Sequence, residues 1–340
     1  MAYTNIDKSS LHFNTKLYTG TGSSNALTGV GFQPDFTWIK RRDATSSHQL
    51  FDAVRGVTKR VFSDTNEAES TSATTLTSFD TDGFTVSTHT GLNASSGTYA
   101  SWNWKANGQG SANSDGTITT TYTSANTTSG FSIVQYTGDG GASSSFGHGL
   151  GVKPDVVIYK QTSGTENWLV TTDVIDGSHD YAYLDITTGF NGAGSALPTS
   201  SVVNLTASGL YNNNGSTYIA YCFAPIKGFS KFGAYTGNGS TDGVFIYTGF
   251  KPAFLILRRT NAENWIMLGN KRNAYNVVNN LILPNQNIAE FASDYVDFVS
   301  NGFKLRTSAT GANANGGITF YMCFAEAPLV GSNNVPCTAR

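Results

Sequence analysis

Histidine, cysteine and acidic side chains are the residues of this sequence with the chemistry for metal binding or catalysis. No two histidines have the His-x-x-x-His spacing of a metal site, and no two cysteines form Cys-x-x-Cys. The histidines are His12, His48, His89, His148 and His179. Glycine-rich segments are abundant, but none is followed by the Lys-Ser/Thr of a phosphate-binding loop. The sequence therefore predicts neither a metal nor any other cofactor.

Acidic residues gather most closely in the segment Asp80-Thr81-Asp82-Gly83. A Ca²⁺ site needs several oxygen ligands that converge in one loop, whereas Asp is also common in plain turns. We favour the turn, and the sequence leaves open whether Ca²⁺ binds. A glycosidase would need two carboxylates that face each other across a cleft, and no such pair can be named. We therefore expect no catalytic residues and a protein that is not an enzyme.

Aromatic and amide side chains offer another chemistry, the binding of sugars. All five tryptophans lie in segments that recur along the chain, so core packing is the interpretation we favour; they are Trp38, Trp102, Trp104, Trp168 and Trp265. Variable loops rich in Asn and Gly are the more plausible place for a sugar, namely residues 93–97, 212–215 and 311–317. Asn and Gly in these loops are more often solvated turns than ligand contacts, and we favour the turns, so the binding residues stay unknown.

Positive charge is densest at Lys40-Arg41-Arg42, with Arg55, Lys59 and Arg60 further along the chain. Such a patch would suit an anionic partner, either a surface polysaccharide or another subunit. A solvated strand end is the simpler interpretation, and we favour it.

These residues sit on a threefold internal repeat. Tyr18-Thr19-Gly20-Thr21-Gly22 returns as Tyr136-Thr137-Gly138-Asp139-Gly140 and as Tyr235-Thr236-Gly237-Asn238-Gly239. A proline-led apolar run follows each copy, from Pro34 to Lys40, Pro154 to Lys160 and Pro252 to Arg258. Each copy closes on an aromatic residue 86, 87 or 89 residues after its first Tyr, at Trp104, Phe223 and Phe324. Self-similarity with this constant spacing indicates three copies of one domain.

The elements expected in each repeat are short strands joined by glycine turns. Proline begins each apolar run, where its missing N–H matters least, and Gly83, Gly209 and Gly302 each begin another strand late in the repeat. Residues 287–296 are expected to form a short helix or turn. The pattern predicts an all-β protein of three tandem antiparallel β-sandwich modules, jelly-roll or lectin-like, of about 90–100 residues each. The expected segments are a lead-in (1–14), module 1 (15–107), a Gly/Ser/Thr-rich linker (108–130), module 2 (131–227), module 3 (228–331) and a tail (332–340).

Composition limits the partners of this chain. Its 340 residues carry a formal charge of −2, which argues against binding of nucleic acid, because that requires a basic face. No segment approaches the roughly 20 apolar residues of a membrane span, and the N-terminus lacks the apolar core of a signal peptide. Three cysteines exclude a disulfide scaffold. Cys222 and Cys323 occupy equivalent places and should be buried and too far apart to bridge, while Cys337 has no visible role.

The signature of the first repeat resembles a family of structural proteins of tailed bacteriophages, especially marine ones. The resemblance rests on four segments, Gly31 to Lys40, Leu50 to Gly56, Leu76 to Phe84 and Tyr99 to Ala106, and on the opening Met-Ala-Tyr-Thr-x-Ile-Asp-Lys. The later repeats match more loosely and lack the Val-Arg-Gly of residues 54–56. The resemblance implies a virion component, often labelled a tail fibre or a minor structural protein.

We therefore predict a non-enzymatic structural protein of a tailed-phage virion. A tail-associated role, as tail fibre or tail tip, would serve recognition of the host surface through a glycan. Other virion proteins are the expected partners, and a homo-oligomer such as a trimer is the expected assembly. The protein would be made in the host cytoplasm and exposed on the particle surface. The alternatives are a capsid decoration or head-fibre protein and a carbohydrate-active enzyme acting on host envelope polysaccharide.

Overall fold

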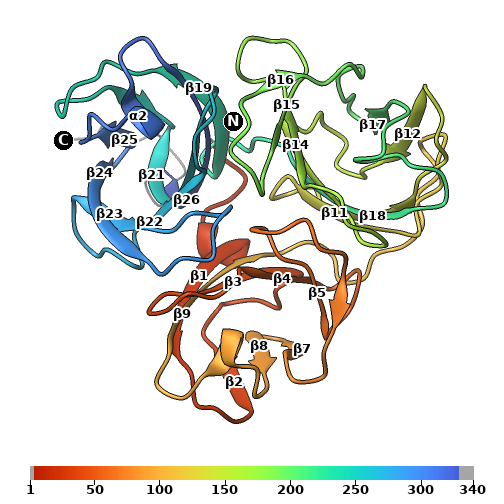
Figure 1. Cartoon of the computed structure of the whole chain (residues 1–340), viewed down its shortest axis with the longest axis horizontal. Helices are drawn as coiled ribbons and strands as arrows, with labels where there is room; N and C mark the ends of the chain where they lie inside the picture. The colour runs from red at the N-terminus through yellow and green to blue at the C-terminus, as the bar shows by residue number, and fades with distance from the viewer. Residues whose placement is uncertain (1–3, 329–340) are drawn as a thin grey trace.

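The computed structural model describes residues 4–328 and is built almost entirely from strands (Figure 1). Strands account for 43% of the chain and helices for 3%, and the paired strands of every sheet run antiparallel. The prediction of an antiparallel all-β protein is therefore confirmed. Cys337 and the tail 332–340 lie outside the described residues.

Each sequence repeat contributes one main sheet with the same strand order. In repeat 1 the order is β1 (Phe13–Thr19), β9 (Thr98–Trp104), β3 (Phe36–Arg41), β4 (Gln49–Asp52). In repeat 3 it is β19 (Ser230–Thr236), β26 (Ile318–Pro328), β21 (Phe250–Arg259), β22 (Ile266–Gly269). Repeat 2 has β11 (Phe131–Thr137), β18 (Thr217–Phe223), β13 (Val156–Gln161), β14 (Leu169–Thr172), extended at its edges by β10 (Tyr122–Asn126), β15 (Asp180–Tyr183) and β16 (Asn191–Gly192).

A second, smaller sheet accompanies each main sheet. The strand orders are β2 (Asn25–Thr28), β8 (Gly83–Val86), β7 (Leu76–Asp80) in repeat 1; β12 (Ser144–Gly147), β17 (Val202–Leu205) in repeat 2; and β20 (Phe245–Tyr247), β25 (Gly302–Leu305), β24 (Phe291–Val299), β23 (Val278–Leu281) in repeat 3. The remaining elements are the hairpin β5 (Lys59–Arg60) and β6 (Ser70–Thr71), the 3-10 turn η1 (Ser9–Leu11), and the one-turn helices α1 (Thr90–Asn93) and α2 (Thr310–Asn313).

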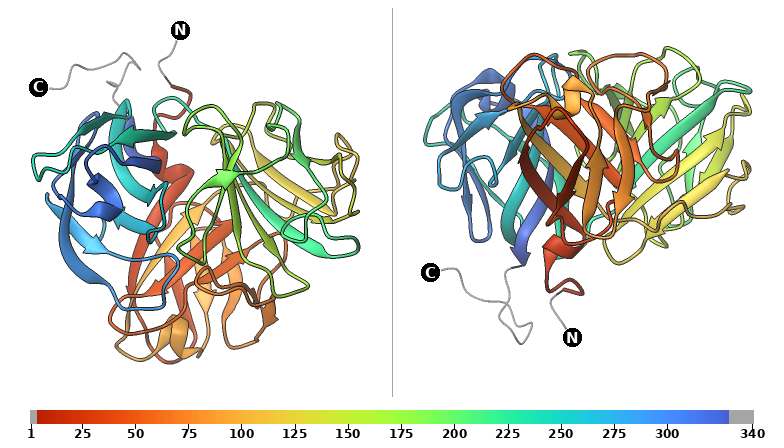
Figure 2. Two further views of the ribbon diagram at one scale, coloured as in Figure 1. Left: turned by 45° about the horizontal axis from the view of Figure 1, so that its top comes forward. Right: turned by 90° about the horizontal axis from the view of Figure 1, so that it is seen from below.

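The three repeats form three lobes around a common centre (Figures 1 and 2). The last strand of each repeat shows why, because its alternate side chains enter two different hydrophobic clusters. In β9, Trp102 and Trp104 join a cluster shared by all three repeats, whereas Tyr99 joins a cluster of repeat 1 alone. In β18, Tyr221 and Phe223 join the shared cluster and Cys222 the cluster of repeat 2. Because side chains alternate with period two, both faces of each main sheet are buried.

The closing aromatic residues meet at the centre of the molecule. Trp104, Phe223 and Phe324 come from equivalent ends of β9, β18 and β26, and each is at most 3% exposed. Their ring centroids are 5.7–6.3 Å apart, and all three pairs meet edge to face at 69–76°. This is the geometry that aromatic quadrupoles favour. The prediction that the tryptophans pack in the core is confirmed, since all five are at most 3% exposed.

The recurring Tyr-Thr-Gly-x-Gly loop is fixed by steric and hydrogen-bonding needs. The Tyr hydroxyl donates to a backbone carbonyl shortly before the last strand, from Tyr18 to Leu92, Tyr136 to Tyr211 and Tyr235 to Ala312. At Gly20 and its equivalents an added Cβ would overlap the carbonyl oxygen of residue 94, 213 or 314. The second glycine has a φ of +75°, +71° or +68°, a conformation that favours glycine.

Two expected elements are absent from their predicted places. Gly209 does not begin a strand; it lies in the turn that corresponds to α1 and α2, and the strand meant is β17 (Val202–Leu205). Val202 lies 21 residues before Phe223, as Gly83 lies 21 before Trp104. Valine thus begins this strand in repeat 2, and the glycine of the strand pair lies on the partner strand β12, where Gly147 is opposite Val202. Residues 287–296 also form no helix, because Phe291–Val299 is strand β24.

The segment expected to link the first two repeats takes part in a sheet. Tyr122–Asn126 forms β10, which pairs along its whole length with β11. Ile118, nearby, is 7% exposed and joins the cluster of repeat 2. The segment 108–130 therefore extends the main sheet of the second repeat and brings an apolar side chain to its core.

Truncating one ring of the central triangle should destabilise all three repeats together. We expect Phe324→Ala to lower the free energy of unfolding by about 3–5 kcal/mol, the usual cost of a large buried cavity. Urea unfolding measures the loss, and hydrogen exchange followed by mass spectrometry shows whether peptides of every repeat lose protection. The matched control is Tyr275→Ala, at a ring that is 86% exposed. A loss confined to peptides of repeat 3 would show that the lobes fold independently.

Candidate functional site

A buried cation ends the proline-led strand of every repeat. Lys40 in β3, Lys160 in β13 and Arg258 in β21 have 0% exposed surface. Each donates to a backbone carbonyl of another repeat: Lys40 Nζ to Asn287 at 3.2 Å, Lys160 Nζ to Asn66 at 3.0 Å, and Arg258 Nη2 to Thr188 at 2.6 Å. These bonds run from repeat 1 to 3, from 2 to 1 and from 3 to 2. The three cations therefore form a closed cycle of contacts.

The interpretation of the basic group as a solvated strand end is wrong for its main members. Lys40 and Arg55 are buried, and Arg42 is paired with Glu290. Arg60 bonds to Gln49 and His89 within its own repeat. The physical reason is that β3 is buried on both faces, so its Lys side chain carries the ammonium to carbonyls at the neighbouring repeat. The sequence did contain this signal, because a basic residue ends all three proline-led runs.

A ring N–H makes a second contact at each junction. Trp168 Nε1 donates to the Phe62 carbonyl and Trp265 Nε1 to the Tyr183 carbonyl, both at 2.7 Å. His48 occupies the same position in repeat 1, with its Nε2 3.0 Å from the Leu283 oxygen. Trp38 Nε1 donates to His48 Nδ1, so Nε2 carries the ring proton. Burial lowers the pKa of His48 well below its usual value, which keeps the ring neutral.

A backbone bond completes each junction. The N–H groups of Glu69, Phe190 and Glu290 donate to the carbonyls of Thr162, Thr260 and Arg42 at 2.8–3.0 Å. The third junction joins the last repeat to the first, so the cycle closes between segments that are distant in sequence. A sequence comparison within one repeat does not reveal these contacts, because donor and acceptor belong to different repeats.

An oxygen acceptor, half-buried in repeat 1 and buried in repeats 2 and 3, holds the start of the β4, β14 or β22 strand. The backbone N–H of His48, Trp168 or Trp265 donates to Oδ1 of Asp64, Asp185 or Asn285 at 2.9–3.1 Å. Burial raises the pKa of Asp64, and it raises the pKa of Asp185 to about 6. Sequence reasoning missed this position because Asn replaces Asp in the third repeat. The shared requirement is therefore the acceptor oxygen and not the charge.

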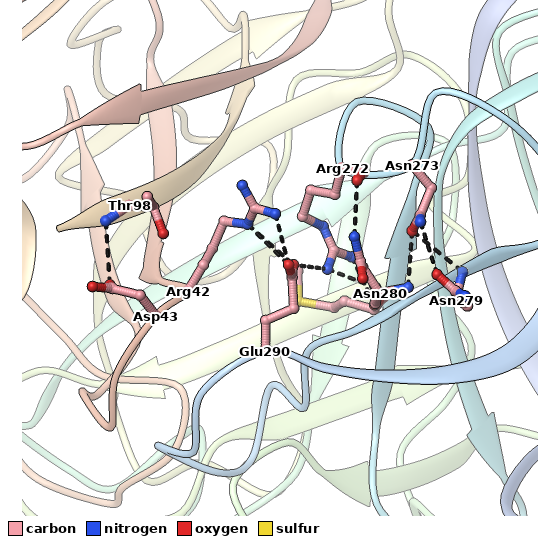
Figure 3. Close-up of polar contacts among 9 residues, drawn as sticks. Arg42, Asp43, Thr98, Arg272, Asn273, Asn279, Asn280 and Glu290 are labelled. Atoms are coloured by element: carbon pink, nitrogen blue, oxygen red, sulfur yellow. Dashed lines mark hydrogen bonds and ion pairs between the residues drawn. The ribbon is translucent and has the colours of Figure 1, made fainter. Parts of the chain in front are cut away.

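Arginine and glutamate pair at two of the three junctions, and Figure 3 shows the one around Glu290. Glu290 accepts from Arg272 at 2.6 Å and from Arg42 of repeat 1 at 2.7 Å. The equivalent pair in repeat 1 is Arg55 with Glu69 at 3.1 Å. Arg272 is thus the counterpart of the arginine in the Val-Arg-Gly segment, although the surrounding residues differ.

In repeat 2 the same two positions are apolar. Ile175, three residues after β14, replaces the arginine, and Phe190 replaces the glutamate. Both pack against the shared core, and Phe190 lies 5.8 Å from the Phe320 ring of repeat 3. A buried ion pair and an apolar pair of similar volume can substitute for each other. The charges at the other two junctions therefore serve packing between repeats.

The acidic turn weighed as a possible calcium site is committed to local hydrogen bonds. Both carboxylate oxygens of Asp82 accept backbone N–H groups, from Gly29 and Gly31, and these bonds lower its pKa. Asp80 accepts the Thr85 hydroxyl. These contacts support the turn interpretation. Across residues 4–328, no three His, Cys, Asp or Glu side chains gather as a metal site would require.

Asparagines of the three candidate loops are structural clamps. Asn93, Asn212 and Asn313 have 0% exposed surface. Each accepts the N–H of the x residue in the Tyr-Thr-Gly-x-Gly loop and donates to the carbonyl two residues later. Because they are buried and fully engaged with the loop backbone, these three side chains are not available as ligand contacts, the less favoured of the two interpretations. Cys222 and Cys323 are buried, unpaired and in separate clusters, as predicted.

Pockets open beside these clamps in two repeats. In repeat 3 a cavity of about 210 Å³ lies between the start of β22, the β23–β24 hairpin and the residues that begin α2. In repeat 2 a cavity of about 260 Å³ lies in the corresponding place, between β14, β15 and residues 206–211. Of the loops singled out from the sequence, 311–317 reaches its cavity through Gly311, whereas 212–215 contributes no lining residue; the residues just before the buried asparagines line both cavities.

The pattern that defines the family described as Domain of unknown function (DUF7483) matches residues 8–328. The chain belongs to this family. No curated protein and no solved structure matches it. The described helices are single turns of three or four residues, too short to cross a membrane.

The buried lysines should make stability depend on alkaline pH. Burial lowers the pKa of Lys40 and Lys160 from 10.5 to about 8. Between these values the unfolded chain holds more protons than the folded one, so stability rises with pH, by at most about 1.4 kcal/mol per pH unit for each lysine.

We expect a rise in urea-unfolding free energy from about pH 8 to pH 9.5. It should vanish in the Lys40→Met/Lys160→Met variant and persist in Lys59→Met, whose side chain is 44% exposed. An unchanged slope in the double variant would contradict the assignment.

Proposed function

We propose that the chain is a non-enzymatic structural protein of a tailed-phage virion, associated with the tail and engaged in recognition of the host surface. The resemblance of the first repeat to phage structural proteins supports this proposal. The observation that carries it is the cyclic set of junction contacts. Lys40, Lys160 and Arg258 are buried and bond to neighbouring repeats, so they hold the scaffold together.

Each repeat, in this proposal, is one lectin-like β-sandwich module. The paired sheets support it, because residues of both sheets enclose a cluster of their own. In repeat 1, Leu27 of β2 and Phe84 of β8 share a cluster with Ile39 of β3 and Phe51 of β4. A scaffold with both faces of its main sheet buried suits a particle component, since its binding loops can vary without disturbing the core.

Immunogold electron microscopy of purified particles tests the location. Gold at the tail tip or fibres is the expected result. Gold over the capsid would transfer the protein to the alternative role of capsid decoration or head fibre. Intact particles without gold, when the same antibody labels the purified chain, would overturn the virion proposal. The enzyme alternative would then be tested by incubating purified host envelopes with the protein and measuring released sugars.

The proposal includes assembly with other virion proteins and a homo-oligomer, for which a trimer is the expectation from the symmetry of such assemblies. Light scattering during size-exclusion chromatography should give three times the chain mass of 36.2 kDa. A mass of a single chain at micromolar concentration would argue against self-association outside the particle. Mixing with isolated tail proteins would then show whether assembly needs a virion partner.

A further inference from the structure

The pockets of repeats 2 and 3 occupy one structural position, which repeat 1 fills with its own side chains. Two residues define this position in each repeat. One is the first residue of β4, β14 or β22. The other lies four places before the acceptor that holds the start of that strand, which is Asp64, Asp185 or Asn285. That second residue is Arg60 in repeat 1, Tyr181 in repeat 2 and Leu281 in repeat 3. Tyr181 and Leu281 line their cavities.

Arg60 closes the position in repeat 1 with hydrogen bonds. Its Nη1 donates to Gln49 Oε1 at 3.1 Å and lies 2.7 Å from His89 Nε2. Its guanidinium also lies over the Phe62 ring at 5.1 Å. Gln49 is the counterpart of Leu169 and Ile266, the first residues of β14 and β22. The chain thus contains one internally plugged copy of the position and two open ones.

The open position in repeat 3 combines apolar walls with polar groups at one side. Ile266, Leu281 and Leu283 form the buried wall, and Phe291, 39% exposed, stands at the rim. Glu263, Asn264 and Thr310 bring a carboxylate, an amide and a hydroxyl. Thr310 Oγ1 donates to Glu263 Oε1 at 3.2 Å, so the carboxylate retains acceptor capacity.

Two further polar groups of this pocket have hydrogen-bonding capacity to spare. Asn264 uses its Oδ1 to accept from Asn285 and Gln286, and its Nδ2 has no partner among residues 4–328. The Tyr295 hydroxyl likewise makes no hydrogen bond within the described chain, although its residue is 7% exposed. Neither atom is among the fully buried polar atoms that lack a partner in the described chain, so both are open to solvent at the pocket. Unused donors beside an apolar wall indicate a ligand that has both apolar faces and hydroxyl groups.

We propose that the pocket of repeat 3 binds one ring of a neutral sugar, and that its counterpart in repeat 2 binds a second. Phe291 and the leucine wall contact the apolar face of the ring, while Glu263 accepts from ring hydroxyls and Asn264 and Tyr295 donate to them. In repeat 2, Tyr181 and Tyr211 supply the aromatic surface and Thr206 and Ser208 the hydroxyls. Cavities of 210 and 260 Å³ are smaller than the roughly 300–1,000 Å³ of sites for drug-sized ligands, which suits a single ring.

The charge of the pocket selects against acidic ligands. Glu263 is the acidic residue that lines the repeat 3 pocket. Its Oε1 forms a long ion pair with Arg259 Nη1 at 3.8 Å. An anionic sugar would place like charges together in a partly desolvated site, which weakens its binding relative to a neutral one. This inference rests on the proposed role in host-surface recognition and names the ligand class and the residues that recognise it.

The test is ligand-observed NMR titration of the purified full chain with methyl glycosides of neutral hexoses and N-acetylhexosamines, and with a uronic acid for comparison. We expect at least one neutral glycoside to bind and the uronic acid to bind more weakly. Glu263→Gln and Tyr295→Phe should each weaken that binding several-fold at the repeat 3 site. Leu281→Arg, which installs the plug of repeat 1, should abolish it there, and Tyr181→Arg should do the same in repeat 2.

The control is Tyr275→Ala, which removes an exposed ring that lines a separate cavity of about 420 Å³. Binding should be unchanged in this variant. Thermal melting verifies that each variant folds, and Glu263→Gln and Tyr295→Phe keep the test valid if an introduced arginine disrupts folding. The proposal is overturned if no neutral glycoside binds, or if binding survives every pocket substitution. If gold labels the particles but no sugar binds, this inference is rejected and the virion role stands. If a sugar binds but the particles are not labelled, the virion role is rejected and the sugar site stands.

Discussion

The edge-to-face contact of Trp104, Phe223 and Phe324 is the interaction on which the rest of the structure depends. Each ring lies on an inner strand of its main sheet, next to the proline-led strand. Bringing the three rings together therefore brings three sheets face to face and buries the second face of each. That burial in turn forces Lys40, Lys160 and Arg258 out of solvent. Each reaches a carbonyl of another repeat, and contacts within its own repeat add to this compensation.

The junctions show which of their parts are interchangeable. Indole and imidazole donate equally well to the facing carbonyl, at Trp168, Trp265 and His48. Aspartate and asparagine accept equally well at Asp185 and Asn285. The Arg–Glu ion pair of the other two junctions is replaced in repeat 2 by Ile175 and Phe190. What every junction retains is a buried donor, a buried acceptor and filled volume. The charges of the Arg–Glu pairs and of the aspartate acceptors are therefore poor guides to function, because neutral residues occupy the same positions in another repeat.

Much of this arrangement could be predicted from the sequence. The Tyr-Thr-Gly-x-Gly loop, the proline-led strand and the closing strand recur because each has a steric or packing requirement that few residues meet. The clearest failure was Gly209, which was aligned with Gly83 and Gly302 as the start of a strand. In repeat 2 the glycine of this strand pair lies on the partner strand, at Gly147 opposite Val202. A comparison of the Gly83 and Gly302 strands alone therefore could not locate the equivalent strand. The junction contacts were equally hidden, because their partners lie in different repeats, and the closure from Asn287 to Lys40 spans most of the chain.

The candidate site was harder to predict than the fold for a related reason. Asparagines of the variable loops attract attention in the sequence, yet Asn93, Asn212 and Asn313 are fixed because they hold the loops together. The residues that open or close a pocket, Arg60, Tyr181 and Leu281, differ in every repeat and therefore carry no repeated pattern. A scaffold whose shared core and loop clamps do not involve these positions leaves them free to diverge. Differences between the repeats, and not their shared motifs, are accordingly where recognition in this protein should be sought.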